Sequence, residues 1–255
     1  MVIKYRKKML RLAQIWFEPV PAGRTAGTGK GADIAFYHQV EKPVSGLFAI
    51  SQPFHTQVSD LTLPGEELFS QISKTERYQI RKNMRDDVTV ENWDSPSLLE
   101  HPEVLEGLAE MFEAMYASKN TPKTMNREQI LQYAKAGGLF VTCVKKDGEA
   151  LVYHSYTMDE KNARLLHSVS DFREREDASL IARSNKRLHW ADMELFSSMG
   201  IEVYDWGGIS SLEKPNGIDS FKMKFGGQLV TRYNVFLGRT ILGKLAILAL
   251  KIKGF

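Results

Sequence analysis

The chain has 255 residues and a formal net charge of +3, with 43% hydrophobic and 25% charged residues. These proportions are ordinary for soluble globular proteins and argue against a mostly disordered chain or a polytopic membrane protein. The single cysteine, Cys143, excludes an internal disulfide and a cysteine-rich zinc site, and the six histidines lack metal-ligand spacing, so we expect no metal site.

The first hundred residues predict a mixture of helices and short strands. A basic helix is expected at residues 1–17 and an exposed glycine-rich loop at 21–32. Strands are expected at 34–39, 47–51, 57–63 and 88–93, with one helix over 66–84. In that helix Lys74, Arg77, Arg81 and Arg85 step by three and four residues, which places them on one face as candidate phosphate ligands. Such a stripe is also typical of a solvated helix surface.

From residue 101 onward the pattern is more regular. Helices are expected at 103–118 and 126–136, followed by a three-stranded antiparallel meander over 139–169 with an Asp147-Gly148 hairpin turn. A long helix at 178–199, with Asp177 as its N-cap, a strand at 201–206, a short helix at 217–225 and a strand at 228–236 complete the series. We therefore expect an α+β fold with a mixed, mostly antiparallel twisted sheet flanked by helices.

Both ends of the chain are basic. Residues 1–32 carry seven Lys and Arg against one acid, residues 220–255 carry seven against none, and residues 33–219 carry 20 against 30. This pattern favours anionic partners, such as phosphates, nucleic acid or a membrane surface, or else it merely keeps the chain soluble. No export signal is recognisable, so we expect a cytoplasmic protein, with contact at the inner face of the membrane left open.

The C-terminal tail, residues 237–255, is both basic and apolar. Its uninterrupted apolar part, 245–250, is far shorter than the roughly 20 residues that a membrane-spanning helix needs. The tail therefore predicts either a helix lying in the membrane interface or a helix packed on the protein's own core.

Three motifs in order resemble known acyltransferases. The order of elements after residue 101 is similar to that of a GNAT acyltransferase domain. Residues 60–82 contain DLTLPGEELF, residues 182–210 end in YDWGGIS, and residues 217–230 contain FKMKFGG. These segments resemble successive motifs of the Fem-type aminoacyltransferases, which build peptidoglycan cross-bridges.

The resemblance implies a domain organisation with two departures from the family. Fem-type enzymes usually carry two GNAT-like domains, whereas here a reduced N-terminal portion, 1–100, is expected to pack on one GNAT-like domain, 101–236. Acetyl-CoA-dependent GNAT proteins also have a glycine-rich pyrophosphate loop after the fourth strand. Residues 170–177 contain no glycine there, although Arg173 and Arg175 could contact a phosphate.

The resemblance also implies a reaction and its residues. An acyl or aminoacyl group would pass from acyl-CoA or aminoacyl-tRNA, with no tightly bound cofactor, to an amine or hydroxyl of a nucleotide-linked cell-envelope precursor or a polysaccharide. Lys222 would offset the negative charge of the tetrahedral oxyanion, with Phe221 as an apolar wall. Asp205 would either orient or deprotonate the acceptor amine, or hold the turn that follows it.

A second function class stays open. The glycine-free loop and the reduced N-terminal portion favour a noncatalytic GNAT-like scaffold that docks on an anionic membrane or on nucleic acid. The intact FK..FGG and YDWGG segments favour the transferase.

Overall fold

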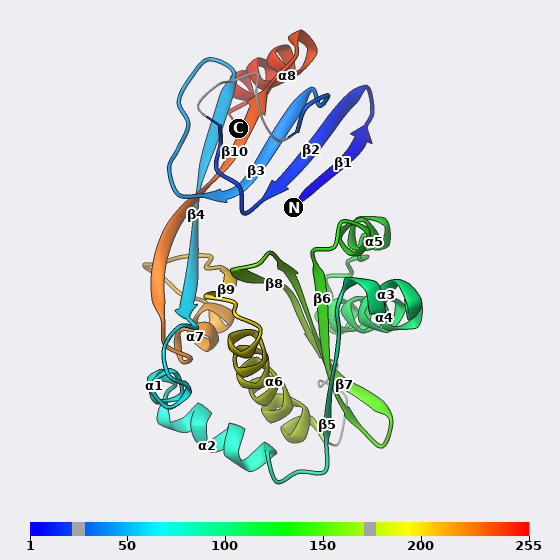
Figure 1. Ribbon diagram of the computed structural model, residues 1–255, viewed down its shortest axis with the longest axis vertical. Helices are drawn as coiled ribbons and strands as arrows, with labels where there is room; N and C mark the ends of the chain where they lie inside the picture. The colour runs from blue at the N-terminus through cyan, green and yellow to red at the C-terminus, as the bar shows by residue number, and fades with distance from the viewer. Residues whose placement is uncertain (22–28, 171–176, 255) are drawn as a thin grey trace. The chain divides into compact units, whose positions relative to one another are not determined.

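The structure is a computed structural model that describes residues 1–21, 29–170 and 177–254 (Figure 1). It divides into two compact units. The first unit comprises Met1–Thr56, Gly208–Lys214 and Leu229–Phe255, and the second comprises Gln57–Gly207 and Pro215–Gln228. These boundaries differ from residues 100 and 236, which the sequence suggested, and that earlier division stays a prediction.

In the described part of the first unit, the strands lie in the spatial order β1, β2, β3, β10, β4, and a helix follows β10 along the chain. Their bounds are β1 (Val2–Lys7), β2 (Leu10–Trp16), β3 (Ile34–Val40), β4 (Ala49–Asp60), β10 (Gln228–Gly238) and α8 (Ile241–Ile252). β4 and β10 also supply residues to the second unit. β2 pairs with β1 in the antiparallel sense and with β3 in the parallel sense.

The helix expected at residues 1–17 is wrong, because this segment forms the β1–β2 hairpin. The two strands pair from Val2 opposite Ile15 to Lys7 opposite Leu10, so each satisfies backbone hydrogen bonds of the other. Lys8, with a φ of 57°, makes the turn. The two strands expected at 47–51 and 57–63 are likewise a single strand, β4.

The second unit is a sheet with the spatial order β4, β9, β8, β7, β6, β5. Its other strands are β5 (Thr89–Trp93), β6 (Leu139–Lys146), β7 (Glu149–Met158), β8 (Asn162–Ser170) and β9 (Val203–Gly208). β5 to β8 pair in the antiparallel sense, and β9 pairs with β8 in the parallel sense. The expected mixed, mostly antiparallel sheet is thus confirmed.

Helices cover both faces of this sheet (Figure 1). The long helix α6 packs on β6, β7 and β8, while α3, α4 and α5 pack on the other side. Their bounds, with the remaining helices, are α1 (Gly65–Gln71), α2 (Lys74–Asn83), α3 (Ser95–Glu100), α4 (Pro102–Ala117), α5 (Arg127–Lys135), α6 (Ala178–Ser198) and α7 (Gly217–Met223). A core cluster of this unit includes Tyr156, Phe196, Tyr204, Trp206 and Phe225.

Three local expectations need correction. The single helix expected at 66–84 is two helices, because Ile72 is extended and buried and the Ser73 hydroxyl accepts a hydrogen bond from the Glu76 amide at 3.4 Å, which starts α2. Asp177 occupies the N-cap position of α6 without a side-chain hydrogen bond to the helix. α3 was not expected from the sequence; its N-cap is Asp94.

Within the described part of the chain, no helix is both long and apolar enough to span a membrane.

Candidate functional site

The FK..FGG segment forms α7 and the turn after it. Lys222 lies in the last turn of this seven-residue helix, which begins with a capping box between Asn216 and Asp219. The buried Gln57 amide donates to the Lys222 carbonyl at 2.7 Å and also to the Gly226 carbonyl. The backbone from Lys222 to Gly226 is therefore fixed to β4.

The two glycines of this motif are required by packing. Gly226 and Gly227 have φ values of 76° and 90°, which favour glycine. A Cβ at Gly226 would lie 2.7 Å from the Cβ of Gln71, and one at Gly227 would lie 2.3 Å from the Val58 carbonyl oxygen. The FGG part of the motif thus places α7 against β4 and α1.

Aromatic side chains of α7 and of the turn after it pack against rings from β9 and α6. Phe225 is fully buried, with its ring 4.7 Å from that of Trp206, and the partly buried Phe221 ring lies 5.5 Å from His189. The predicted apolar wall beside Lys222 is therefore part of a packed aromatic layer.

Polar groups lie within that layer. His189 Nδ1 and the Tyr204 hydroxyl are 2.8 Å apart, and the Tyr204 and Tyr156 hydroxyls are also 2.8 Å apart. Tyr156 donates to the buried Asp192 at 2.5 Å. Burial lowers the pKa of His189, so this ring is neutral. Its contact with the Tyr204 hydroxyl links α6 to β9 within the aromatic layer. His189 and Asp192 are three residues apart on α6, and both are buried. Two polar residues on the buried face of a predicted helix are the sequence feature from which this hydrogen-bonded group could have been inferred.

The Lys222 side chain is half-buried in a charged environment. Burial lowers its pKa, as does the charge of Arg164, whereas Asp205 and Asp219 act in the opposite direction. Asp205 is 9% exposed, and its Oδ1 accepts a hydrogen bond from the Gly207 amide at 2.7 Å. This hydrogen bond lies within the last residues of β9, and Asp205 also places its charge near Lys222.

Arg164 and His167 were missed by the sequence analysis. The parallel pairing of β8 with β9 places Arg164 opposite Asp205. The register of β8 shifts beside Leu166, and this irregularity lies between Arg164 and His167. Burial, assisted by the charge of Arg164, lowers the pKa of His167 to about 4, so its imidazole is neutral at pH 7.

Lys222 and Arg164 lie beside Gly207. A Cβ at this residue would lie 3.8 Å from Lys222 Nζ, 4.0 Å from Arg164 Nη2 and 3.1 Å from the Leu165 carbonyl oxygen. Gly207 itself is buried, and the lack of a side chain lets both cations lie close to its backbone. A developing oxyanion beside the two cations would be stabilised by both positive charges.

The expected phosphate ligands are only partly described. Arg173 and Arg175 lie outside the described residues. Lys74 and Arg81 are exposed on α2, Arg77 is half-buried, and Arg85 is exposed beyond the end of the helix. The Arg81 guanidinium lies 5.1 Å from the centre of the Phe69 ring.

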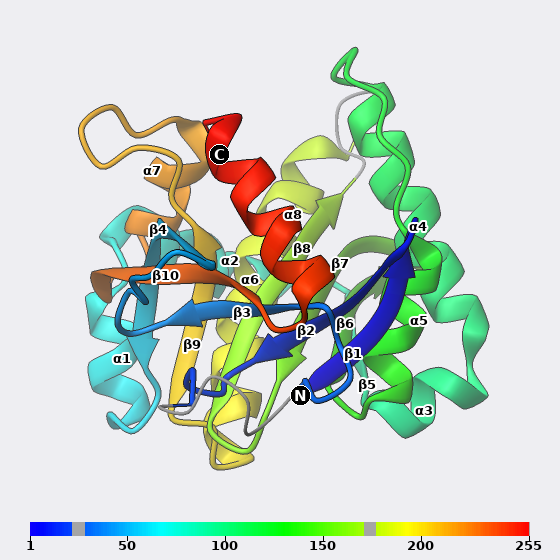
Figure 2. The same cartoon turned by 90° about the horizontal axis from the view of Figure 1, so that it is seen from above.

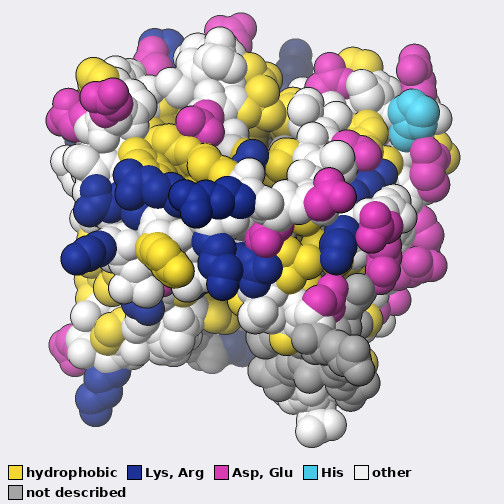
Figure 3. Space-filling view, turned by 90° about the horizontal axis from the view of Figure 1, so that it is seen from below, with side chains coloured by type: hydrophobic (Ala, Val, Ile, Leu, Met, Phe, Trp, Pro, Cys, Tyr) yellow, Lys and Arg dark blue, Asp and Glu magenta, His cyan; other side chains and the backbone are white. Residues whose placement is uncertain are grey.

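The face of the second unit that carries α2 shows a band of Lys and Arg side chains (Figure 3). On the inner side of α2, the buried Glu76 lies 2.6 Å from Lys186 and 3.6 Å from Lys224. The charge of Glu76 is therefore paired with Lys186 and Lys224, and the exposed Lys74 and Arg81 of α2 remain at the surface.

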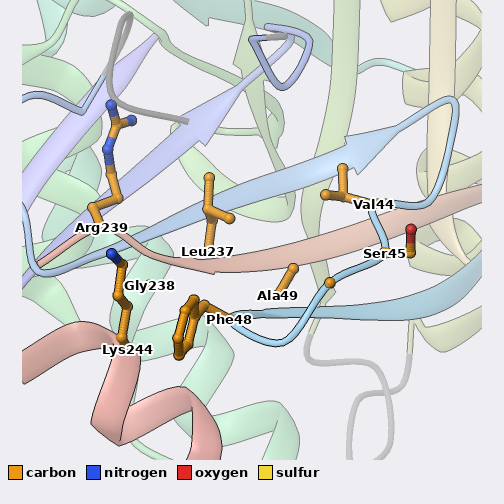
Figure 4. A pocket seen from close by; sticks show the side chains of 9 residues that line it. Val44, Ser45, Phe48, Ala49, Leu237, Gly238, Arg239 and Lys244 are labelled. Carbon is orange, nitrogen blue, oxygen red and sulfur yellow. The ribbon is translucent and has the colours of Figure 1, made fainter. Parts of the chain in front are cut away.

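The first unit has a small pocket of about 100 Å³ that holds none of the predicted site residues (Figure 4). Phe48, Leu237, Arg239 and Lys244 contribute to its lining, and the Lys244 ammonium lies 5.2 Å from the centre of the Phe48 ring.

Cys143 is buried in β6, and burial raises the pKa of its thiol to about 12, which makes it a poor nucleophile. In the described ranges, no group of three or more His, Cys, Asp or Glu side chains is placed to hold a metal ion.

Comparison with known proteins identifies the fold. No model of a known protein family matches the chain, and neither does any curated protein. Among solved structures, FemX matches with a TM-score of 0.68 and 13% identity over 98% of this chain and 85% of FemX. The L-PGS of Bacillus licheniformis matches with a TM-score of 0.53 and 14% identity over 87% of this chain and 73% of that one.

A third similar structure is the C-terminal domain of a protein from Agrobacterium fabrum, assigned as a lysylphosphatidylglycerol synthetase. It matches with a TM-score of 0.56 and 16% identity over 86% of this chain and 72% of that one. The chain therefore has the GNAT-like fold that its motifs predicted, and it resembles a Fem-type protein over nearly its whole length.

Proposed function

We propose that this protein is an acyltransferase that moves an aminoacyl or acyl group from aminoacyl-tRNA or acyl-CoA to an amine or hydroxyl of a cell-envelope component. The observation that carries this proposal is the pair of cations, Lys222 and Arg164, which lie together beside the buried backbone of Gly207. The similarity in fold to FemX, together with the Fem-type motifs, supports the same reaction class.

In the proposed reaction, the acceptor amine or hydroxyl attacks the donor carbonyl beside Gly207. The C–N or C–O bond to the acceptor forms, and the carbonyl oxygen takes the negative charge. Collapse of the tetrahedral intermediate breaks the bond to the carrier, which leaves as tRNA or the CoA thiol. Lys222 stabilises the oxyanion, and Arg164 adds to the local positive charge.

The proton of the acceptor needs a destination. Asp205 lies two residues before Gly207 and opposite Arg164, and its charge acts on Lys222. We assign Asp205 the role of accepting this proton, either directly or through a water molecule.

The α2 stripe of Lys74, Arg77, Arg81 and Arg85 supplies a phosphate-binding surface for a polyanionic donor or a nucleotide-linked acceptor. Three of its members, Lys74, Arg81 and Arg85, are exposed. The acidic residues next to the stripe are Asp86 and Asp87, which follow its last member in the sequence.

The test is a transfer assay. The purified protein is incubated with aminoacyl-tRNA or acyl-CoA and with nucleotide-linked peptidoglycan precursors, and mass spectrometry follows the mass of the acceptor. Ligands that co-purify with the native protein guide the choice of donor. An acceptor mass increase that is lost in Lys222→Ala supports the proposal. Transfer that is equally fast in Lys222→Ala and the parent protein contradicts the assigned site.

A further inference from the structure

The outward face of α8 is an unusual surface. Ile241, Leu245 and Ile252 are 80%, 58% and 86% exposed, although all three are large aliphatic residues. Their spacing of four and seven residues places them on one side of the helix, and the exposed Ala249 lies on the same side. The helix therefore presents an apolar stripe to solvent, which we call the outer stripe (Ile241, Leu245, Ala249 and Ile252).

The opposite side of α8 is packed. Ile247 is fully buried with Ile34 and Ile50, and Leu250 packs against the same cluster. A Cβ at Gly243 would lie 1.8 Å from the Asp33 carbonyl oxygen, so the helix backbone rests directly on the chain before β3. Figure 2 shows α8 lying across the strands of the first unit. The outer stripe is thus held rigidly by the core.

Lysines flank the outer stripe. At 100° per residue, Lys244 and Lys251 lie between the packed side and the outer stripe on one flank, and Lys253 lies on the other flank. Lys251 donates to the Gly46 carbonyl at 2.8 Å, and the neighbouring Leu47 is 61% exposed. An apolar stripe bordered by lysines on both sides is the arrangement of a helix that lies in a membrane interface.

The net charge of the first unit indicates what kind of partner covers the outer stripe. The residues of the first unit include 14 Lys and Arg against four Asp and Glu, a net charge of +10, while α8 carries no acid. A second copy of the chain would bring the same positive charge to this face and be repelled. An anionic bilayer supplies both the apolar interior for the outer stripe and the phosphates for the lysines.

We propose that α8 docks the first unit on an anionic membrane surface, with the outer stripe at the level of the acyl chains and Lys244, Lys251 and Lys253 at the phosphates. The helix spans about 18 Å, and its axis lies parallel to the bilayer plane. Arg239, which lines the pocket beside the start of α8, adds a further cation at this edge (Figure 4). The sequence left open whether this segment binds membrane or core; α8 has one face for each.

The test measures co-sedimentation of the full chain with vesicles. Vesicles of equal parts phosphatidylglycerol and phosphatidylcholine should retain the protein, whereas vesicles of phosphatidylcholine alone should not. The double variant L245Q/I252Q should bind the anionic vesicles at least about tenfold more weakly, because two aliphatic side chains lose their burial in lipid. The matched control L99Q/M199Q changes two exposed apolar residues of the second unit and should bind like the parent.

A charge series separates the two contributions. K251Q/K253Q should weaken binding and reduce its salt dependence, while the control K135Q/K146Q, at exposed lysines of the second unit, should not. Because substitutions on α8 could disturb folding, circular dichroism and melting temperature are measured for each variant, and the milder L245S provides a second reading.

Three results would overturn the proposal. The first is an absence of binding to anionic vesicles by the parent protein. The second is binding that L245Q/I252Q and L245S leave unchanged. The third is a dimer in light scattering that L245Q/I252Q dissociates, since a second copy would then cover the outer stripe. None of these measurements uses a transfer substrate, so the result is independent of the proposed function.

Discussion

Two lysines of α7 and its C-cap show how environment separates residues of the same type. Lys222 is half-buried, with Arg164 and Asp205 near it. Lys224, two residues further on, is 55% exposed and lies 3.6 Å from Glu76. Of these two lysines, Lys222 is the one that lies beside Gly207.

We expect Lys222→Ala to lower kcat by about a hundredfold to a thousandfold, the usual effect of removing one well-placed oxyanion donor. The melting temperature should change little, because a cation whose burial lowers its pKa contributes little to folding. Steady-state kinetics and thermal melts check both parts. Lys222→Arg should rescue poorly, since its planar guanidinium is larger.

Lys224→Ala is the control for this experiment and should retain most of the activity. Equal losses in the two variants would indicate general electrostatics in place of a specific role for Lys222.

His167 provides a pH test of the folded state. Its folded pKa of about 4 lies below the ordinary value of 6.5, so between these pH values the unfolded chain binds a proton that the folded chain does not. Stability conferred by the neutral ring is present above pH 6.5 and is lost as the pH falls toward 4. The difference corresponds to at most about 3 kcal/mol, reduced by the partial exposure of the ring.

We therefore expect the parent protein to lose more stability on acidification from pH 7 to pH 4 than His167→Gln does. Urea titrations at several pH values measure this difference. Parallel curves for the two proteins would show that His167 titrates normally.

Among the elements, the turn from α7 into β10 depends on glycine for two reasons, the sign of φ and the lack of space. Gly227→Ala would have to accommodate a Cβ that lies 2.3 Å from the Val58 carbonyl oxygen. Gly137, after α5, has a φ of 74° but no atom within 4 Å of its Cβ position, so it isolates the cost of φ.

We expect Gly137→Ala to destabilise the fold by about 1–2 kcal/mol, the cost of a left-handed conformation. Gly227→Ala should cost at least about 2 kcal/mol more, because backbone must shift to remove the overlap. Urea denaturation compares the two variants, and equal losses would mean that the Val58 contact relaxes freely.

The α2 stripe permits a test of donor binding. If the donor is aminoacyl-tRNA, K74Q/R81Q/R85Q should weaken its binding and lower the slope of log affinity against log salt by about 2–3, because three phosphate contacts are lost. The control K123Q/K135Q/K146Q removes three exposed lysines elsewhere in the second unit. Equal slopes for the two triple variants would remove the stripe from donor recognition.

For the whole molecule, charge is divided between the units. The first unit has a net charge of +10, and the second unit, with 20 basic and 27 acidic residues, has −7. The proposed chemistry belongs to the second unit and the proposed docking surface to the first. Different charge in each unit suits different partners.

The two functions should therefore be separable. Lys222→Ala should bind anionic vesicles like the parent, and L245Q/I252Q should transfer normally to a water-soluble acceptor. Vesicle binding and acceptor mass, measured on the same preparations, check this. Loss of both properties in either variant would show that docking and transfer depend on each other.

The sequence alone determined most of the second unit. Helix and strand periods are local properties, so the meander β6–β8, the long helix α6 and the segment from β9 to β10 could be predicted from residues 139–236, and the FK..FGG motif located Lys222. The sequence could not place Arg164 and His167, because their position depends on the register between β8 and β9 and on the irregularity beside Leu166.

The tertiary structure decided the first unit. The short basic segment at residues 1–17 is ambiguous by itself, and it becomes a hairpin because β3 offers its edge to β2, which satisfies the backbone hydrogen bonds of that strand. The same holds for α8, since hydropathy shows an apolar helix but not which residues meet the core. Ile34 and Ile50, distant in sequence, bury Ile247 and leave Ile241, Leu245 and Ile252 facing outward.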